Sequence, residues 1–469
     1  MWILVVAIVA LVAFYARTPK TKIPKYKGDG WFSFLADAEA YSMRPIELLN
    51  RATAQCGNVF SIQVLTVYNV FLRGNELNKA YLEVREDVWS FGGGMGIFIN
   101  KILDDGYFDN LRTLVGSLSR YINRASAQEY TARCTTIEAE KTADAIAAQK
   151  DVALFDTVSG MAHKIIVRTL MGEDFYAVAD ELLDILHDME SDIGSLYSFI
   201  LPSWVPHPPA RRLEAARQRF KKIFFDMLER RGEFLGEKAS DAPDYVAYTM
   251  TDKTTVPLKH YMPSHHTVLM FAAHTSTVAS IAWNLVSMLR NPEVLARVQA
   301  DLRSDGGDDL LLQACIKETG RYYAGIKTLR LAKQEIKVPG TDLTVPKGAV
   351  VSIAPYLTHH DPANWASPQV WDPSRWIDTA TNELVVPDNT KGASGLKYIP
   401  FGYGSHRCVG EKMAGIIVTG ALTTILRDYD IAWATPETPD SVDFTCLDFD
   451  KIGTPWLKGD VRVKLTKRE

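Results

Sequence analysis

The chain contains few cysteines for its length, and they form no pairing pattern. Its 469 residues include only five, with no Cys-x-x-Cys motif among Cys56, Cys134, Cys315, Cys408 and Cys446. This argues against a disulfide framework, a zinc ribbon and a thioredoxin-type site. The remaining question is whether a single cysteine carries its own chemistry.

The chain also lacks an excess of charge of one sign and any repeated or low-complexity segment. The formal net charge is −4 and the isoelectric point is about 6.2, which does not suit a nucleic-acid-binding protein. Hydrophobic residues make up 47% and charged residues 23%, which excludes a wholly disordered or collagen-like protein. The length suggests about three domains, or one large domain with an appendage.

Long hydrophobic runs are absent except at the N-terminus. Residues 1–16 carry no charge, and several basic residues follow before the first acid, namely Arg17, Lys20, Lys22, Lys25 and Lys27. A cleaved signal peptide carries its positive charge before the apolar run, whereas here the charge comes after it. We therefore expect a single transmembrane anchor at 1–16 with a cytosolic basic flank, and a basic, proline-containing linker at 17–30. An uncleaved interfacial segment and a signal peptide remain alternatives.

The body of the chain is expected to be mainly α with small β-sheets. Residues 57–73 alternate in polarity and predict a β-hairpin, and residues 335–355 contain β-type residues separated by turns. Between 75 and 149 the pattern is mostly helical, with the glycine-rich segment 91–96 expected as a flexible loop. That segment lacks the Lys-Ser/Thr of a phosphate loop.

The segment most informative about chemistry is 401–411, which reads FGYGSHRCVGE and precedes an apolar, helix-prone stretch. Cys408 stands at a loop-to-helix junction, where backbone N–H groups and the helix dipole favour a thiolate. Gly404 and Gly410 allow close backbone approach. These features suit an iron porphyrin held by a thiolate, and a buried cysteine in a glycine-rich turn is the plainer alternative.

This segment resembles the haem-binding loop of the cytochrome P450 family, Phe-x-x-Gly-x-Arg-x-Cys-x-Gly. The resemblance implies that Cys408 is the axial ligand of haem b iron, and that the loop holds the cofactor through Phe401, Gly404, His406 and Arg407. His406 departs from the pattern, since the family usually has Arg there. Sterol 14-demethylases carry the same His-Arg-Cys string.

Two further segments resemble the same family. Glu318 and Arg321 are three residues apart in a helical stretch, and Arg375 lies in a Pro-x-Arg-Trp segment similar to the family's Pro-x-Arg-Phe. The resemblance implies one buried network of these three residues, because a guanidinium can bridge a carboxylate and loop carbonyls. Its role would be structural, fixing the chain before Cys408.

The candidate distal helix contains His274, Thr275 and Ser276, and its alignment with the family pattern of an acid followed by a hydroxyl is open. In one register Thr275 takes the acid position and Ser276 the hydroxyl position. In the other, which we prefer, His274 takes the acid position and Thr275 the hydroxyl position, again resembling sterol 14-demethylases. Neither register supplies a carboxylate, so proton relay would use His274, hydroxyls or water. Alternatively, these residues merely satisfy the helix backbone.

Two arginines are candidates for binding haem propionates. Arg330 matches a common position in the family shortly after the Glu-x-x-Arg pair. The family's early Trp-x-x-x-Arg motif is not evident here, and Arg124 is a candidate in its place.

The resemblance implies a P450 fold whose haem-thiolate catalytic domain spans 31–469, anchored in the endoplasmic reticulum membrane and facing the cytosol. The activity implied is oxygen-dependent hydroxylation of an apolar small molecule by a monooxygenase. Because the chain carries no flavin or nicotinamide fingerprint, electrons would come from a separate NADPH-dependent flavoprotein reductase.

The substrate is expected to be a sterol or triterpenoid of a specialised-metabolite pathway. A fatty-acid or other terpenoid hydroxylase is the main rival. Two other classes remain open: a reductase-independent haem-thiolate isomerase or dehydratase, and a non-enzymatic haem or lipid binder.

Overall fold

A computed structural model gives the structure of the chain. It describes residues 19–28, 33–64, 67–193, 207–235, 243–325, 327–385, 387, 392–436, 442, 447–449 and 453–468. The anchor expected at 1–16 and parts of the linker expected at 17–30 lie outside these residues. Within them, the segment Val256–Arg290 is long and apolar enough to cross a membrane, but 72% of its apolar window is buried inside the protein. This helix therefore belongs to the core.

Helices make up most of the described chain, as predicted. The α-helices are α2 (Ser33–Met43), α3 (Pro45–Cys56), α4 (Asn75–Glu83), α5 (Phe91–Ile99), α6 (Leu111–Ile122), α7 (Ala125–Ala147), α8 (Leu154–Met171), α9 (Glu173–Tyr176), α10 (Ala179–Ile193), α12 (Pro208–Leu235), α13 (Tyr245–Thr251), α14 (Met262–Arg290), α15 (Pro292–Arg303), α16 (Leu310–Tyr322), α17 (Pro355–His359) and α18 (Glu411–Asp428). Short 3₁₀ turns connect several of them: η1 (Asn100–Ile102), η2 (Tyr107–Asn110), η4 (Val256–Tyr261), η5 (Pro373–Trp376), η6 (Gly392–Lys397) and η7 (Gly404–His406).

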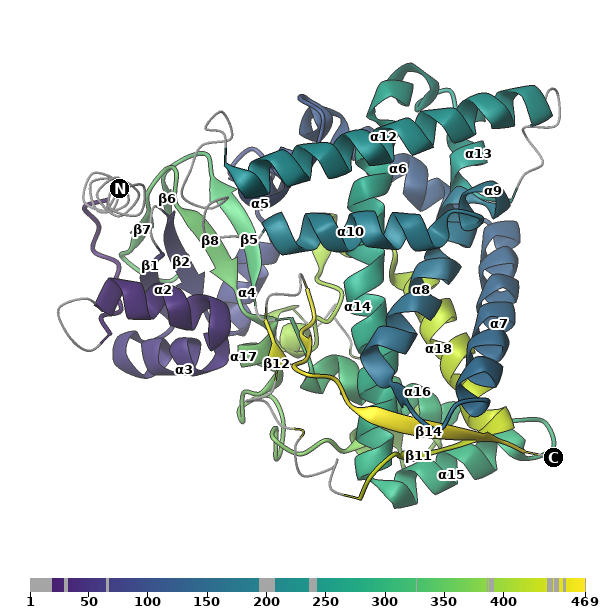
Figure 1. Ribbon diagram of the computed structural model, residues 1–469. Coiled ribbons are helices and arrows are strands. Elements are labelled where there is room, and N and C mark those ends of the chain that lie inside the picture. The colour runs from purple at the N-terminus through teal and green to yellow at the C-terminus, as the bar shows by residue number, and fades with distance from the viewer. Residues whose placement is uncertain are drawn as a thin grey trace.

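The strands form small sheets beside the helical body. They are β1 (Val59–Val64), β2 (Val67–Leu72), β3 (Trp89–Ser90), β4 (Val152–Ala153), β5 (Thr328–Ala332), β6 (Ile336–Lys337), β7 (Thr344–Val345), β8 (Val350–Ile353), β9 (Ile377–Asp378), β10 (Glu383–Leu384), β11 (Tyr429–Trp433), β12 (Leu447–Asp448), β13 (Trp456–Leu457) and β14 (Arg462–Lys467). The largest sheet has the order β1-β2-β8-β5-β3. It lies at one side of the molecule with α2 and α3, while the long helices fill the other side (Figure 1).

The hairpin predicted at 57–73 is confirmed. β1 and β2 pair antiparallel with Val59 opposite Leu72, and β8 then pairs parallel with β2. The strands predicted within 335–355 are also present, as β6, β7 and β8. Strands β1, β2 and β8 bury nearly all of their side chains, as strands in a covered sheet do, whereas β6 and β7 are less buried.

The prediction of a flexible loop at 91–96 is wrong, because this segment begins helix α5. The Ser90 hydroxyl caps the helix by accepting the N–H of Gly93 at 2.8 Å, and Glu86 accepts the N–H of Phe91 at 2.8 Å. A Cβ at Gly94 would lie 2.5 Å from the carbonyl oxygen of Leu329 on β5. The glycines therefore serve close packing of a helix on a strand rather than flexibility.

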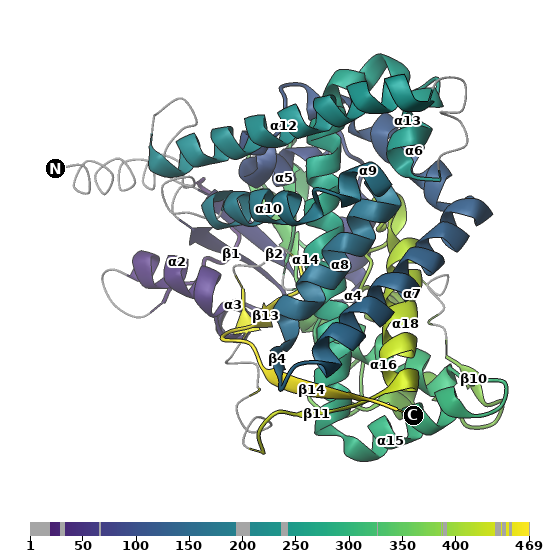
Figure 2. The same cartoon turned by 45° about the vertical axis from the view of Figure 1, so that its right-hand side comes forward.

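Helix α14 is the axis of the helical body. It packs against α8, α16 and α18, and α18 in turn packs against α7; Figure 2 shows α7 and α8 in front of these inner helices. Most of its side chains are buried all round, as expected of a core helix. One stripe is less buried, formed by residues four apart: Val268, Ala272, Ser276 and Ser280.

Candidate active site

The loop that carries Cys408 is held by its own backbone and by the helix that follows. The N–H of Cys408 donates to the carbonyl oxygen of Phe401 at 2.8 Å, and α18 begins three residues after the cysteine. Phe401 is 36% exposed. The backbone hydrogen bond therefore holds this turn, and the exposed Phe401 side chain does not pack to support it.

Gly404 and Gly410 stand where side chains would interfere. Gly404 has φ of +71°, and a Cβ there would lie 3.0 Å from the carbonyl oxygen of Leu82 at the end of α4. A Cβ at Gly410 would lie 3.8 Å from the sulfur of Cys408, an ordinary contact. Gly404 is therefore required for the loop conformation, whereas a Cβ at Gly410 would fit in van der Waals contact with the sulfur.

The Cys408 thiol is enclosed by protein atoms and still keeps an accessible face. Burial raises the pKa of the thiol, while the backbone N–H groups of Gly410 and Glu411 act in the opposite direction. The side chain is nevertheless exposed. A thiol with an open face and backbone donors behind it suits coordination to a metal, because a bound metal ion deprotonates the thiol outright.

The two basic residues before Cys408 have different surroundings. His406 is half-buried, stacks on Phe91 with ring centroids 5.3 Å apart, and lies 3.2 Å from the carboxylate of Glu86. Arg407 is exposed and makes two hydrogen bonds to Glu411, at 2.6 and 2.9 Å. His406 therefore faces the inner side of the loop, whereas Arg407 is engaged at the surface.

The two candidate arginines for a carboxylate ligand also differ. Arg330 on β5 is 2% exposed, and its guanidinium lies over the Tyr81 ring and donates to backbone carbonyls. Its hydrogen bonds to carbonyl oxygens, at 3.2 and 3.5 Å, leave its charge without an ion pair in the part of the chain that the structure describes, and burial lowers its pKa. Arg124 is exposed, with its guanidinium 5.4 Å from the centre of the Tyr248 ring. Of the two arginines, Arg330 is therefore the one whose buried charge an acidic ligand would neutralise.

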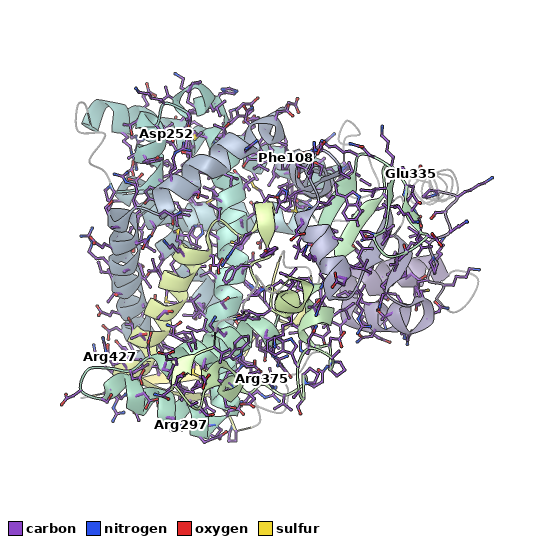
Figure 3. All side chains as sticks on the ribbon, turned by 180° about the vertical axis from the view of Figure 1, so that it is seen from behind. Phe108, Asp252, Arg297, Glu335, Arg375 and Arg427 are labelled. Carbon is purple, nitrogen blue, oxygen red and sulfur yellow. The ribbon has the colours of Figure 1, made fainter. Side chains whose placement is uncertain are left out.

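Glu318, Arg321 and Arg375 come together as one network, with Arg375 placed in the lower half of Figure 3. The Glu318 carboxylate accepts two hydrogen bonds from Arg321, at 2.8 and 2.9 Å, and one from Arg375 at 3.1 Å. Glu318 and Arg321 are completely buried. Arg321 also donates to the carbonyl oxygens of His359, Pro368 and Val370.

Two members of this network were missed from the sequence. Trp376 donates its indole N–H to Glu318 at 2.9 Å. His359 accepts the backbone N–H of Ile399 on its Nε2 at 2.8 Å, which ties the network to the chain entering the Cys408 loop. Trp376 could have been found because it follows Arg375 directly, but no sequence signal marks His359.

Acidification should destabilise the protein through its buried neutral histidines. Burial lowers the pKa of His163, His265, His359 and His360 to about 3. The unfolded chain takes up these protons near pH 6.5 and the folded chain does not, so stability is complete above that pH and is lost as the pH falls toward 3. At pH 5.5 each such histidine costs about 1.4 kcal/mol of unfolding free energy.

Urea unfolding at pH 7.5 and 5.5 measures this loss. His359→Gln should reduce the difference between the two pH values by the share of one histidine, whereas replacement of the exposed His260 by Gln should leave it unchanged. An unchanged difference in His359→Gln would show that His359 already carries a proton in the folded protein.

The three candidate distal residues do not share one environment. His274 is completely buried, with Nε2 3.0 Å from the Ser159 hydroxyl on α8. Thr275 is also completely buried and donates its hydroxyl to Glu190 on α10 at 3.0 Å. Ser276 lies on the less buried stripe of α14, one turn after the exposed Ala272. This exposure favours the first register, with Ser276 as the hydroxyl, over the one we preferred.

The segment around β13 fixes this part of α14. The indole N–H of Trp456 donates to the carbonyl oxygen of Thr275 at 3.0 Å, and Trp283 donates to that of Pro455 at 2.8 Å. A Cβ at Gly453, whose φ is +96°, would lie 2.7 Å from the Ser276 hydroxyl. Any side chain at Gly453 would therefore displace Ser276.

Comparison with known proteins gives one consistent result. The family model described as Cytochrome P450 matches residues 32–448. The chain is 43% identical over 476 residues to the cytochrome P450 monooxygenase pynD of Aspergillus niger, covering 99% of this chain and 97% of that one. It is 44% identical over 434 residues to the cytochrome P450 monooxygenase pyvB of Aspergillus violaceofuscus, covering 92% and 88%.

More distant proteins match as well. The eburicol 14-alpha-demethylase of Penicillium italicum is 27% identical over 485 residues, covering 92% of this chain and 91% of that one. The structure of retinoic acid bound cyanobacterial CYP120A1 superimposes with a TM-score of 0.74 at 16% identity, covering 96% of this chain and all of that one. This last match supports the fold alone.

Proposed function

The chain belongs to the cytochrome P450 family and is a haem-thiolate monooxygenase, and from this premise we propose that it hydroxylates an apolar small molecule. Its electrons come from a separate NADPH-dependent flavoprotein reductase, and it works at the endoplasmic reticulum membrane. The observation that carries the proposal is the Cys408 thiol, which has an accessible face and backbone donors behind it.

The residues present fit the haem that the family implies. Cys408 would hold the iron, and the buried Arg330 would meet one propionate. His406 lies 3.2 Å from Glu86, so it would have to exchange this partner to meet the other. When bound, the haem supplies oxygen activation, which no side chain provides. Arg407 and Arg124 are less suited to this role, because Arg407 is engaged with Glu411 and Arg124 lies over Tyr248.

The side chains of this protein would position, shield and deliver protons. Backbone N–H groups of Gly410 and Glu411 temper the charge on the Cys408 sulfur. The less buried stripe of α14 presents Ala272 and Ser276, so an apolar molecule can approach the Ser276 hydroxyl there. The Glu318 network holds the chain that leads into the Cys408 loop, so that the sulfur keeps its place.

We name a sterol or triterpenoid skeleton as the first substrate class to test. The His-Thr-Ser string at 274–276, the His-Arg-Cys string at 406–408 and the distant similarity to an eburicol 14-alpha-demethylase support it. Identity to pynD and pyvB is much higher, at 43% and 44%, which argues against a housekeeping sterol demethylase. A fatty acid or another terpenoid is the rival class.

Co-expression with a fungal NADPH reductase tests this function. Mass spectrometry of cells supplied with triterpene, sterol or fatty-acid precursors should show a product heavier by one oxygen atom. The product should depend on NADPH and dioxygen in isolated membranes. Turnover without either would instead identify a haem-thiolate isomerase or dehydratase, and ligand-induced spectral shifts without any product would identify a binding protein.

A further inference from the structure

Helix α14 carries no acidic residue to supply protons beside its hydroxyls. Its 29 residues from Met262 to Arg290 include neither Asp nor Glu. Proton delivery by a side chain generally needs a group that exchanges protons readily, and a lone hydroxyl does this poorly. A carboxylate would therefore have to come from another element.

The structure brings a carboxylate to the helix from α10. Glu190 accepts the Thr275 hydroxyl proton in a hydrogen bond of 3.0 Å. Thr275 is completely buried, whereas Glu190 is only half-buried. The pair therefore spans from a side chain with access to solvent to a hydroxyl inside the protein.

The contact between Glu190 and Thr275 lies beside the part of α14 that is open to a substrate. Thr275 directly precedes Ser276, which lies on the less buried stripe with Ala272. In the register that this stripe favours, Thr275 occupies the position where the family pattern places its acid. Glu190 thus reaches the acid position from outside the helix, and the Trp456 indole fixes the Thr275 backbone there.

Histidine rings also lie beside this part of α14. His274 on α14 has the His163 ring of α8 at 5.8 Å and the His187 ring of α10 at 6.3 Å. Burial lowers the pKa of His163 to about 3, so this ring is neutral at physiological pH. Asp104 accepts the hydroxyl of Ser264 at the start of α14, whereas Glu190 accepts that of Thr275 in the middle of the helix.

Resting on the proposed monooxygenase function, we propose that Glu190 supplies from α10 the carboxylate that α14 lacks, and passes protons through the Thr275 hydroxyl toward Ser276. Glu190 takes a proton from solvent and donates it to the Thr275 oxygen. The Thr275 hydroxyl releases its own proton to a water that carries it toward Ser276, because adjacent side chains of a helix do not face each other. Rotation of the hydroxyl restores the first hydrogen bond, so one proton is moved and no group is left changed.

Infrared spectroscopy of the substrate-free ferric holoenzyme tests whether Glu190 holds and exchanges a proton. The carboxyl band of Glu190 should be missing in Glu190→Gln and shifted in Thr275→Val, which removes the hydrogen bond. Asp184→Asn, an exposed position on the same helix, is the matched control and should leave the band unchanged. A band indifferent to both Glu190→Gln and Thr275→Val would overturn the proposal.

Turnover driven in two ways separates proton delivery from a structural role. With NADPH, reductase and the substrate found by co-expression, Glu190→Gln should form about tenfold less product or lower, with a matching rise in released hydrogen peroxide. Driven by added hydrogen peroxide, which brings its own oxygen, electrons and protons, the variant should match the wild type. Glu190→Asp should recover part of the NADPH-driven rate.

The remaining outcomes are also decisive. An equal loss under both drives would show that Glu190 only supports the fold, and no loss under either would remove it from the relay. If co-expression yields no oxygenated product, the proposed hydroxylation fails, and the infrared result alone then decides whether Glu190 exchanges protons with Thr275.

Discussion

In the Cys408→Ala variant we expect complete loss of the thiolate-shifted carbon monoxide spectrum and of all NADPH-driven product formation. Cys408 supplies the loop with an anionic sulfur ligand for a soft or borderline metal, whereas His406 would bind only as a neutral imidazole and Arg407 cannot lose its proton. The measurement is the reduced carbon monoxide difference spectrum of the purified variant after haem reconstitution.

Variants of two other cysteines serve as controls for the loss of the spectrum in Cys408→Ala. Cys56 is half-buried at the end of α3 and Cys315 is completely buried in α16. Cys56→Ala and Cys315→Ala should both retain the thiolate-shifted spectrum, although Cys315→Ala should lose some stability from the cavity it creates. A normal spectrum in Cys408→Ala would mean that another residue is the ligand.

The parts of the candidate site whose geometry follows from the sequence are local in the chain. The Cys408 loop needs a glycine with positive φ, a cysteine and a helix start within eight residues, and all of them follow from the segment 401–411. Glu318 and Arg321 lie on one helix face because they are three residues apart. Their meeting with Arg375 was expected from resemblance rather than from spacing.

The parts that the sequence did not predict depend on distant contacts. Glu190 lies 85 positions from Thr275, and His359 lies 40 from Ile399, so no periodicity connects the members of either pair. The glycine run at 91–96 was interpreted as a loop because glycine weakens helices in isolation. The glycines are needed because a side chain at Gly94 would collide with the backbone of Leu329 in β5, and the sequence alone does not reveal this contact.

The choice of register in α14 shows the same limit within a single helix. Thr275 and Ser276 both carry a hydroxyl group, so the sequence allows either residue to be the one that faces the active site. Exposure separates them: Thr275 is completely buried, whereas Ser276 continues a stripe with Ala272 and Ser280. Which face of a buried helix is open depends on its neighbours on all sides, and the helix sequence does not contain that information.

Replacing Glu318 with Ala should have the largest effect on stability. The change leaves the completely buried Arg321 without its carboxylate and removes the acceptor of Arg375 and Trp376. Breaking a buried ion pair by removing one partner costs about 3–5 kcal/mol of unfolding free energy. Urea unfolding of the holoenzyme measures this cost, and the haem-to-protein ratio should fall with it, because Arg321 also holds the carbonyl of His359.

Two further variants test whether this loss of unfolding free energy comes from the burial of the ion pair. Glu39→Gln breaks an exposed pair with Arg44 and should cost less than about 1 kcal/mol. Arg375→Ala should lie between the two, with poor folding and haem loss, because Glu318 keeps both bonds from Arg321 but loses one donor. A well-folded Arg375→Ala variant with full haem content would contradict the place of Arg375 in the network. An equal loss of unfolding free energy in Glu318→Ala and Glu39→Gln would show that burial adds nothing to the strength of the Glu318–Arg321 ion pair. The graded order is expected because the penalty follows the charge left unpaired in the interior rather than the number of bonds removed.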